Sequence, residues 1–469
     1  MSSLSKEKMV AGAAWSTIGK VVAMLANFVV TTVIARALSP ADCGIYFVAL
    51  TTIVIVAGIG ALGMDQVVVR FAGTAEARSD KAVMRQVIAC CYGIVAIGAV
   101  VVALAFYALA PVMFRSVLSQ PGLLAYAGIL AAWVFFATLQ RQEAETFRGL
   151  NDIRMTTLAG GMRNGGVLNA LLVCVGLIVL WASGKLTLNS AMLTMLVASI
   201  VLVIYSAAIL WRRLRPDGSS PTRTGEPVLN VRKAIHEGWP LGLSGFIVIL
   251  NNMGSTWLAS PLDTANHVAL FGVAQRVMQV LIAPMMIVNA ILPPIVAELH
   301  ANGSERRLER VVQAVGGLVL LPSLVVLAIL VVAGRPILGA VFGSYYEAAY
   351  PILVLVCIGQ TMNIATGAWQ IVLPMTGNKH RMLTSSVIAV VTQLVLGLIL
   401  GSKAGFGLGV LGVAIAYCAS ITITNLAGMV LVHRKLGVWT YASLNWRTVR
   451  DAYGMLAQRV NRKLAVQRS

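Results

Sequence analysis

The sequence predicts an all-α polytopic membrane protein with twelve transmembrane helices in two parallel six-helix lobes. Three observations lead to this prediction. Of 469 residues, 58% are apolar and only 11% are charged, whereas about 25% of the residues of a soluble protein are charged. Apolar runs of about 20 residues recur along the chain, each long enough to cross the roughly 30 Å hydrocarbon core of a bilayer. Weak internal similarity then divides these runs into two sets of six.

The apolar runs are expected to be helices because a backbone in lipid must satisfy its hydrogen bonds within the segment. Short strands of alternating hydrophobicity, which would predict a transmembrane barrel, are absent from the sequence. The expected spans are residues 13–35, 45–64, 87–110, 122–140, 160–182, 190–211, 239–260, 268–297, 311–333, 350–372, 384–402 and 407–432.

The positions of the charges predict the topology. A net charge of +19 could by itself indicate a nucleic-acid-binding protein, but most of the 36 Lys and Arg residues fall at the N-terminus, in the tail and in alternate loops. This bias follows the positive-inside rule and predicts that both termini are cytoplasmic. We expect a multi-pass membrane protein that binds no nucleic acid. The basic residues assigned to the outer side are Arg36, Arg115, Lys185, Arg335 and Lys403.

A polar linker separates the two expected lobes. Residues 212–238 read "RRLRPDGSSPTRTGEPVLNVRKAIHEG", a composition typical of cytoplasmic linkers. We expect an N-lobe at 1–211, a C-lobe at 239–432 and a basic cytoplasmic tail at 433–469. The tail has apolar residues at helical spacing among basic ones, so we expect it to bind anionic membrane lipids. Docking to a polysaccharide polymerase or assembly protein is the alternative.

Two short loops indicate that the lobes are repeats. "FRGLNDIRM" at 147–155 and "PMTGNKHRM" at 374–382 share a Gly, an Asn and a closing Arg-Met, and Trp15 matches Trp239 at a similar offset. Each half holds an even number of spans, so both halves begin on the same side and are parallel repeats. We expect the glycines of the two loops to end helices and the loops to anchor the topology rather than bind substrate.

Five motifs resemble one protein family, and the resemblance covers nearly the whole chain. The motifs are "ARALSPADCGIY", "GMDQVVVRF", "ALFGVAQRV", "VFGSYYEAAYPILVL" and "QIVLPMTGNKHRM". In this order they resemble the polysaccharide transporter (oligosaccharide flippase) branch of the MOP superfamily of MATE-like exporters. The resemblance implies a flippase that moves polyprenyl-pyrophosphate-linked oligosaccharides across the inner membrane by alternating access. The export of exopolysaccharide, capsule or O-antigen would depend on it, and no cofactor is implied.

Basic residues in the spans are candidate substrate contacts, since a charge inside a bilayer is costly and usually faces protein or water. Lys20, Arg163 and Arg276 fall within spans, and Arg36 ends the first span. We expect all four in the substrate-binding cavity, with Arg276 binding a phosphate or acidic sugar. The resemblance implies that the first helix of each lobe lines the cavity, which favours Lys20. Interfacial positions, snorkelling and helix packing are the alternatives.

Neutral polar residues in the spans are a second set of candidates. Asn27 and Asn251 occupy equivalent positions in the two repeats. We expect them to hydrogen-bond sugar hydroxyls, the alternative being a bridge between helices.

Carboxylates are expected to be absent from the membrane interior. Asp65 and Glu298 lie at the ends of spans, and no Asp or Glu lies deep within one. Ion-coupled pumps usually place carboxylates inside the membrane, so a cation-coupled drug or lipid exporter of the same superfamily is the alternative rather than the preferred function. The energy source stays open among an ion gradient, the membrane potential and removal of the product.

A membrane polysaccharide polymerase or ligase is the alternative from a different class. Such an enzyme needs positioned acidic, basic or metal-binding groups on its outer face. The longest expected outward loop, residues 334–349, carries only Arg335 and Glu347 as charges, and the sequence has no cluster of His, Cys and carboxylates that indicates a metal site. We therefore expect a transporter, with no catalytic residue and no bound metal.

Overall fold

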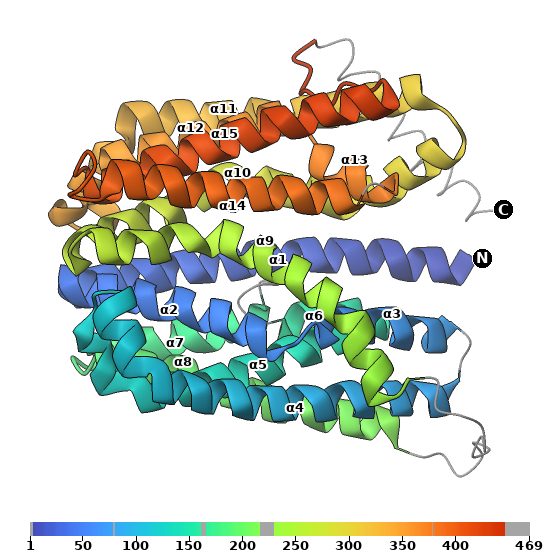
Figure 1. The fold of residues 1–469 in the computed structure, drawn as a ribbon, viewed down its shortest axis with the longest axis horizontal. Coiled ribbons are helices and arrows are strands. Elements are labelled where there is room, and N and C mark those ends of the chain that lie inside the picture. Colours follow the sequence, from blue (N-terminus) through green and yellow to red (C-terminus); the bar gives the residue numbers. More distant parts are fainter. Residues whose placement is uncertain (1–2, 78–79, 161–165, 216–228, 378, 446–469) are drawn as a thin grey trace. The chain divides into compact units, whose positions relative to one another are not determined.

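The computed structural model describes residues 3–77, 80–160, 166–215, 229–377 and 379–445, and all regular structure in these ranges is helical. Eleven helices are long and apolar enough to cross a membrane, and a twelfth apolar helix, Val167–Ala182, is shorter. The expected span at 160–182 begins in residues outside the described ranges. The all-α polytopic fold predicted from the sequence is therefore confirmed (Figure 1).

Each of the twelve expected spans corresponds to one long helix. They are α1 (Ser3–Ala37), α2 (Pro40–Gly60), α4 (Lys81–Val112), α5 (Ala127–Gly149), α7 (Val167–Ala182), α8 (Leu188–Leu214), α9 (Val231–Leu262), α10 (Ala265–Ala301), α11 (Glu305–Phe342), α12 (Tyr350–Ala365), α14 (Lys379–Gly401) and α15 (Gly409–Leu436).

Shorter helical segments occupy several loops. They are α3 (Met64–Ala77), α6 (Ile153–Ala159), α13 (Trp369–Met375), a π-helical turn η1 (Met113–Val117) and the 3₁₀ turns η2 (Pro121–Tyr126) and η3 (Ser344–Ala349).

Local sequence determines where several helices begin. Ser39 caps α2 by accepting a hydrogen bond from the Asp42 N–H, and Pro40 occupies the first turn, where its missing N–H costs nothing. A capping box starts α8, because the Thr187 and Ser190 side chains each accept the other's backbone N–H. The helices therefore begin and end on local signals, while their apolar surfaces account for their length.

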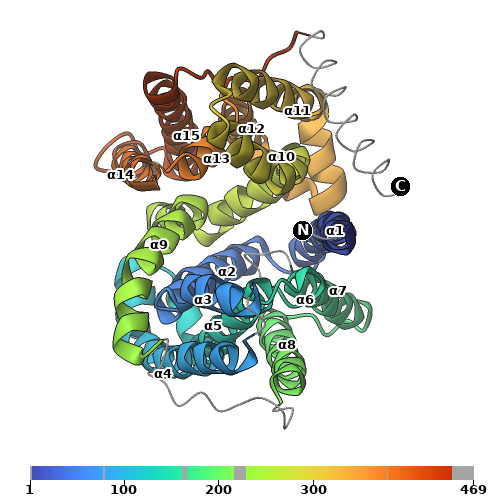
Figure 2. The ribbon, with the colours of Figure 1, turned by 90° about the vertical axis from the view of Figure 1, so that its right-hand side faces the viewer.

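The packing divides the chain into two compact units, and the boundary falls inside α10. The first unit comprises residues 12–272, and the second comprises residues 273–469 with residues 1–11. In the first unit α5 is central and packs on α2, α3, α4, α6 and α8 (Figure 2). In the second unit α15 packs on α12, α13 and α14, and α11 packs on α12.

Helix α9 packs with the first unit, on α2, α3 and α4. Its glycines allow a close approach to the turn between α2 and α3. A Cβ on Gly63, whose φ is +77°, would lie 2.1 Å from the Gly238 carbonyl oxygen, and a Cβ on Gly242 would lie 2.9 Å from the Gly63 nitrogen. The sequence assigned Gly238 to the linker and Gly242 to the second lobe. The division into lobes at 1–211 and 239–432 rests on the repeats and stays a prediction.

A segment after α15, residues 438–443, fastens three helices of the second unit together. The Thr440 hydroxyl donates to the Thr366 carbonyl at 2.8 Å, and the Ala442 and Ser443 N–H groups donate to carbonyls of Ala365 and Gln313 at 2.8 and 2.9 Å. The Trp439 ring stacks on the His433 ring, with centroids 3.9 Å apart. This strap therefore ties α11 and α12 to the end of α15.

Candidate functional site

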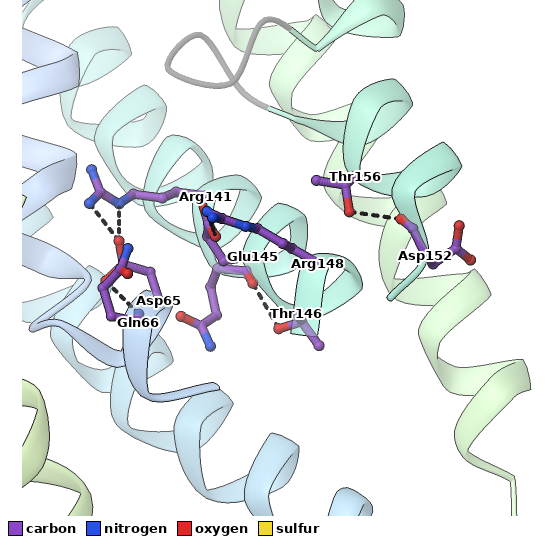
Figure 3. A network of polar contacts seen from close by, with 9 residues as sticks. Asp65, Gln66, Arg141, Glu145, Thr146, Arg148, Asp152 and Thr156 are labelled. Atoms are coloured by element: carbon purple, nitrogen blue, oxygen red, sulfur yellow. Dashed lines mark hydrogen bonds and ion pairs between the residues drawn. The ribbon is translucent and has the colours of Figure 1, made fainter. Parts of the chain in front are cut away.

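A buried ion pair joins α3 to α5 in the first unit. Leu62 and Gly63, both at positive φ, turn the chain from α2 into α3 and place Asp65 in the first turn of α3. The Arg141 guanidinium reaches it from α5, with Nη2 and Nε at 2.5 and 2.9 Å from Asp65 Oδ2 (Figure 3). The side chains of Asp65 and Arg141 are 2% and 12% exposed.

Small residues on two other helices make room for this pair. A Cβ on Gly58 of α2 would lie 3.6 Å from Arg141 Nη1, and a Cβ on Gly245 of α9 would lie 3.9 Å from Nη2. The guanidinium therefore lies where α2, α3, α5 and α9 meet. Because both of its bonds are charge-assisted, the pair fixes the position of α3 relative to α5.

The helix that carries Arg141 is longer and more polar than predicted. The expected span ended at residue 140, but α5 continues to Gly149 through "RQEAETFRG". Glu143 and Glu145 in this extension are 1% and 3% exposed. The predicted end of this span is therefore wrong. The two carboxylates lie in the last seven residues of the membrane-length segment Pro121–Gly149, and the expectation that no carboxylate lies deep within a span stays a prediction.

The reason for this error is physical. Hydropathy drops after residue 140, but Gln, Glu, Ala and Arg are good helix formers and no Gly or Pro occurs between Gly128 and Gly149. Protein rather than lipid covers the two carboxylates, since α5 is surrounded by five other helices. An uninterrupted run of helix-forming residues was the signal that could have predicted this.

The two buried glutamates differ in their partners. Glu145 Oε2 lies 3.2 Å from Arg148 Nη1, one turn further along α5, and the Arg148 side chain is 60% exposed (Figure 3). Glu143 Oε2 is buried without a hydrogen-bond partner among the described residues, and so are both side-chain amide atoms of Gln142. Tyr92 of α4 lies close enough to Glu143 to interact with it electrostatically.

The first of the two repeated loops follows α5 directly. Asn151 adopts a left-handed conformation with φ of 54°, and the Asp152 side chain caps α6 by accepting the Met155 N–H at 3.0 Å. Arg213 of α8 donates to Asp152 Oδ2 at 3.0 Å and to the Leu150 carbonyl at 3.3 Å. These bonds hold the loop between α5, α6 and α8 and agree with a role as an anchor.

The glycines of the two loops have different roles. Gly377 follows α13 with φ of +84°, as expected for a glycine that ends a helix. Gly149 is instead the last residue of α5, and the left-handed residue after it is Asn151. A Cβ on Gly149 would lie 3.0 Å from the Val68 carbonyl oxygen. Helix α5 therefore ends at Gly149 as expected, but Asn151 rather than the glycine takes the left-handed conformation, and Gly149 also allows α5 to pack closely on α3.

Two predicted site residues lie on one face of α1. Lys20 and Asn27 are both half-buried and seven residues apart, a spacing that puts side chains on the same helix face about 10 Å apart. Arg148 of α5 lies near enough to Lys20 for the two positive charges to repel. The Asn27 side chain donates to the Ala23 carbonyl at 2.8 Å, so part of its hydrogen-bonding capacity is used within α1.

The other predicted residues are not brought together with these. Arg36 is exposed in the last turn of α1, and Asn251 is half-buried in α9. Arg276 is half-buried in the part of α10 that belongs to the second unit. Arg163 lies outside the described residues. The sequence also missed Arg148, whose position was assigned to a loop.

The family of the chain follows from its match to a model of a known family. Residues 9–300, more than half of the chain, match the model described as polysaccharide biosynthesis protein. The chain belongs to the polysaccharide biosynthesis protein family. A second model, MatE, matches residues 240–399 of this family member. The resemblance inferred from the five motifs is confirmed, and no curated protein matches the sequence.

Solved structures of MOP-superfamily transporters share the fold of this polysaccharide biosynthesis protein. An inward-facing multidrug resistance MATE family transporter matches with a TM-score of 0.71 at 17% identity, over 88% of this chain and 94% of that one. A MOP superfamily transporter from Pyrococcus furiosus gives 0.62 at 16%, over 92% and 96%. The lipid II flippase MurJ, inward closed, gives 0.63 at 12%, over 90% and 87%.

Identities this low show the fold alone. Together with the family match, the fold identifies a multi-pass membrane transporter of the MOP superfamily. Membership in this superfamily points to transport rather than catalysis.

Proposed function

We propose that this protein is a flippase for polyprenyl-pyrophosphate-linked oligosaccharides in the bacterial inner membrane, with both termini in the cytoplasm. Its family is that of polysaccharide biosynthesis proteins, and one protein that shares its fold is a lipid II flippase. The substrate would enter a cavity open to the cytoplasm and leave on the other side by alternating access. The glycan units would serve the export of exopolysaccharide, capsule or O-antigen.

The observation that carries this proposal is a cation inside a membrane-length helix. Lys20 is half-buried in the segment Trp15–Ala37 of α1, and the charge of Arg148 on α5 acts on it. A cation in such a segment usually faces protein, water or a ligand, and a second positive charge that acts on it favours an anionic ligand. Glu145 bonds to one nitrogen of Arg148 and leaves other guanidinium donors available, since a guanidinium has five N–H groups. A pyrophosphate carries the negative charge and the oxygen acceptors that such a pair would bind.

The remaining predicted residues stay candidate substrate contacts. Asn27 shares the face of α1 with Lys20 and would hydrogen-bond the sugar that follows the pyrophosphate. Asn251 would do the same from α9, and Arg276 would bind a phosphate or an acidic sugar. Arg163 and Arg36 stay candidates for the cavity and its outer mouth.

The test replaces single cations in the full chain and measures glycan export from cells. Lys20→Ala and Arg148→Ala should each reduce export about tenfold or more, because a hydrogen bond to a charged group contributes about 1.5–3 kcal/mol. Arg276→Ala should also impair export, and Arg276→Lys distinguishes charge from bidentate geometry. Membrane levels of each variant must match wild type.

The matched control is Lys185→Ala, which removes an exposed cation from the turn between α7 and α8 and should leave export unchanged. Undiminished export by Lys20→Ala and Arg148→Ala would remove this pair from the binding site.

A cation-coupled drug or lipid exporter is the second candidate, and one observation now favours it more than the sequence did. Glu143 and Glu145 are buried carboxylates inside a membrane-length helix, and ion-coupled transporters use such groups. A deletion strain that becomes sensitive to drugs while its glycan export stays normal would support this candidate over the flippase.

A further inference from the structure

Glu143 is a buried carboxyl group that the proposed substrate site does not use. It is 1% exposed, in the central helix of the first unit. Its Oε2 atom has no hydrogen-bond partner among the described residues. The nearby amide groups of Gln142, and the Nε2 of Gln140, also lack partners there. Several polar groups are therefore buried within one turn of helix without satisfying one another.

The charged groups around Glu143 are paired elsewhere. The described residues include no ion pair to Glu143, and the titratable group that faces it from α4 is Tyr92. Helix α2 contributes no charge here, because its one charged residue, Asp42, lies in its first turn. Among the described residues, the ion pairs that involve α5 are Asp65–Arg141 and Glu145–Arg148, and Asp152, in the loop after α5, pairs with Arg213.

Energetics favour a neutral Glu143. A buried carboxylate without a cation costs several kcal/mol, even after the protein relaxes around it. A carboxylic acid carries no charge and provides one O–H donor. The side-chain amide of Gln142 and the Tyr92 hydroxyl are partners of the right chemistry for that form. Binding a proton converts the carboxylate to this acid and requires no other reactant.

We propose that Glu143 is a proton-binding site in the core of the first unit and that transport is coupled to the proton through it. The coupling rests on the proposed function, whereas the proton site does not. Glu143 lies on the same helix as Arg148, five residues and about 7.5 Å along the axis from it. A change at the anion-binding end of α5 therefore acts on the helix that holds the proton.

Infrared spectroscopy of the purified full chain tests the site without any substrate. At neutral pH the wild type should show the C=O stretch of a protonated carboxylic acid, and this band should shift in D₂O. The band should disappear in Glu143→Gln and persist in Glu145→Gln, which changes the neighbouring buried but paired carboxylate. If the wild type shows no such band, or if the band persists in Glu143→Gln, the proposal is overturned.

A second measurement covers the case in which Glu143→Gln does not fold. Wild-type protein labelled with ¹³C-glutamate should show the same band at lower frequency, because the acid belongs to a glutamate. A band that does not move on this labelling would arise from an aspartate and would equally overturn the proposal.

The coupling is tested in proteoliposomes that contain the full chain and the lipid extract of a deletion strain. An imposed pH gradient should accelerate glycolipid flipping severalfold in wild type and in Glu237→Gln, which changes a carboxylate of the more exposed pair with Arg70, but not in Glu143→Gln. Equal acceleration in Glu143→Gln would overturn the coupling. Absence of flipping in wild type would instead count against the proposed function, and the infrared result would still decide the proton site.

Discussion

Asp65 and Arg141 show how this chain places charges inside its first unit. Both side chains are almost fully buried, and two donors of one guanidinium converge on one carboxylate oxygen. A second ion pair joins α3 to α9, with Arg70 Nη1 at 2.7 Å from Glu237 Oε2. The side chains of Arg70 and Glu237 are 64% and 34% exposed. The two pairs have similar chemistry but different surroundings, so removing one partner should have different consequences.

Asp65→Asn should lower the free energy of unfolding by about 3–5 kcal/mol, because it leaves the Arg141 charge buried without its partner. Glu237→Gln, the matched control at the exposed pair, should cost about 1 kcal/mol or less. Thermal or denaturant unfolding of the purified protein in detergent measures both. Similar losses in the two variants would show that burial does not distinguish the pairs.

Among single residues, the sequence predicted some candidate site residues and missed others. Lys20 was predicted because a lysine within an apolar run is conspicuous. Arg148 and Glu143 were missed because "RQEAETFRG" is polar enough to look like a loop. Their role depends on the packing of α4 on α5 and on the electrostatic effect of Arg148 on Lys20, and neither leaves a pattern in the local sequence.

Among the elements, α9 shows what hydropathy does not predict. Its existence and approximate bounds were predicted, since 239–260 is apolar and Val231–Leu262 is the helix observed. Its packing against the α2–α3 turn was not predicted. That packing depends on glycines at matching positions of two distant segments, and single glycines in apolar runs are too common to indicate a partner.

Gly242→Ala should therefore destabilise the protein by about 1–3 kcal/mol, as expected when a close-packed contact is overfilled. The new Cβ would lie 2.9 and 3.1 Å from backbone atoms of Gly63, which cannot move aside as a flexible side chain would. Unfolding of the purified variants measures the effect.

Gly254→Ala provides the control on the same helix. No atom lies within 4 Å of its Cβ position, so the substitution should be neutral or stabilise by about 0.5–1 kcal/mol through helix propensity. If both variants behaved alike, close packing of α9 on the α2–α3 turn would not be what matters at Gly242.

The strap at 438–443 changes how the basic tail should be tested. A chain that ends at Asn445 keeps the bonds of Thr440, Ala442 and Ser443 and should unfold near the wild-type temperature. A chain that ends at Val438 loses four hydrogen bonds to α11 and to the end of α12, each contributing about 1 kcal/mol, and should unfold at a clearly lower temperature.

The chain that ends at Asn445 separates the two roles predicted for the tail, lipid binding and docking of a partner protein. Residues 446–469 of the tail lie outside the described ranges. Normal export by the chain ending at Asn445 would mean that docking of a glycan-assembly partner through the tail is not essential. Lost export with normal membrane insertion and stability would support docking. Equal unfolding temperatures for the two truncated chains would contradict the role of the strap.

For the whole molecule, the sequence predicted the fold class and the superfamily. Twelve apolar runs and five ordered motifs were sufficient, and the helices and the family model confirm the fold class and the family. The orientation predicted from the charge bias stays a prediction. The substrate could not be predicted in this way, because a glycan is recognised by a surface assembled from many elements. The proposed alternating access requires two bundles that each hold together, and the chain divides into two compact units.

The identity of the transported molecule is the central claim, and a deletion strain tests it most directly. Lipid-linked oligosaccharide should accumulate in the strain, accessible to a membrane-impermeant glycan-modifying probe only from the cytoplasmic side of the membrane. Restoring the full chain should move the glycan to the outer side and restore export. Lipid-linked glycan that reaches the outer side equally with and without the protein would contradict the account.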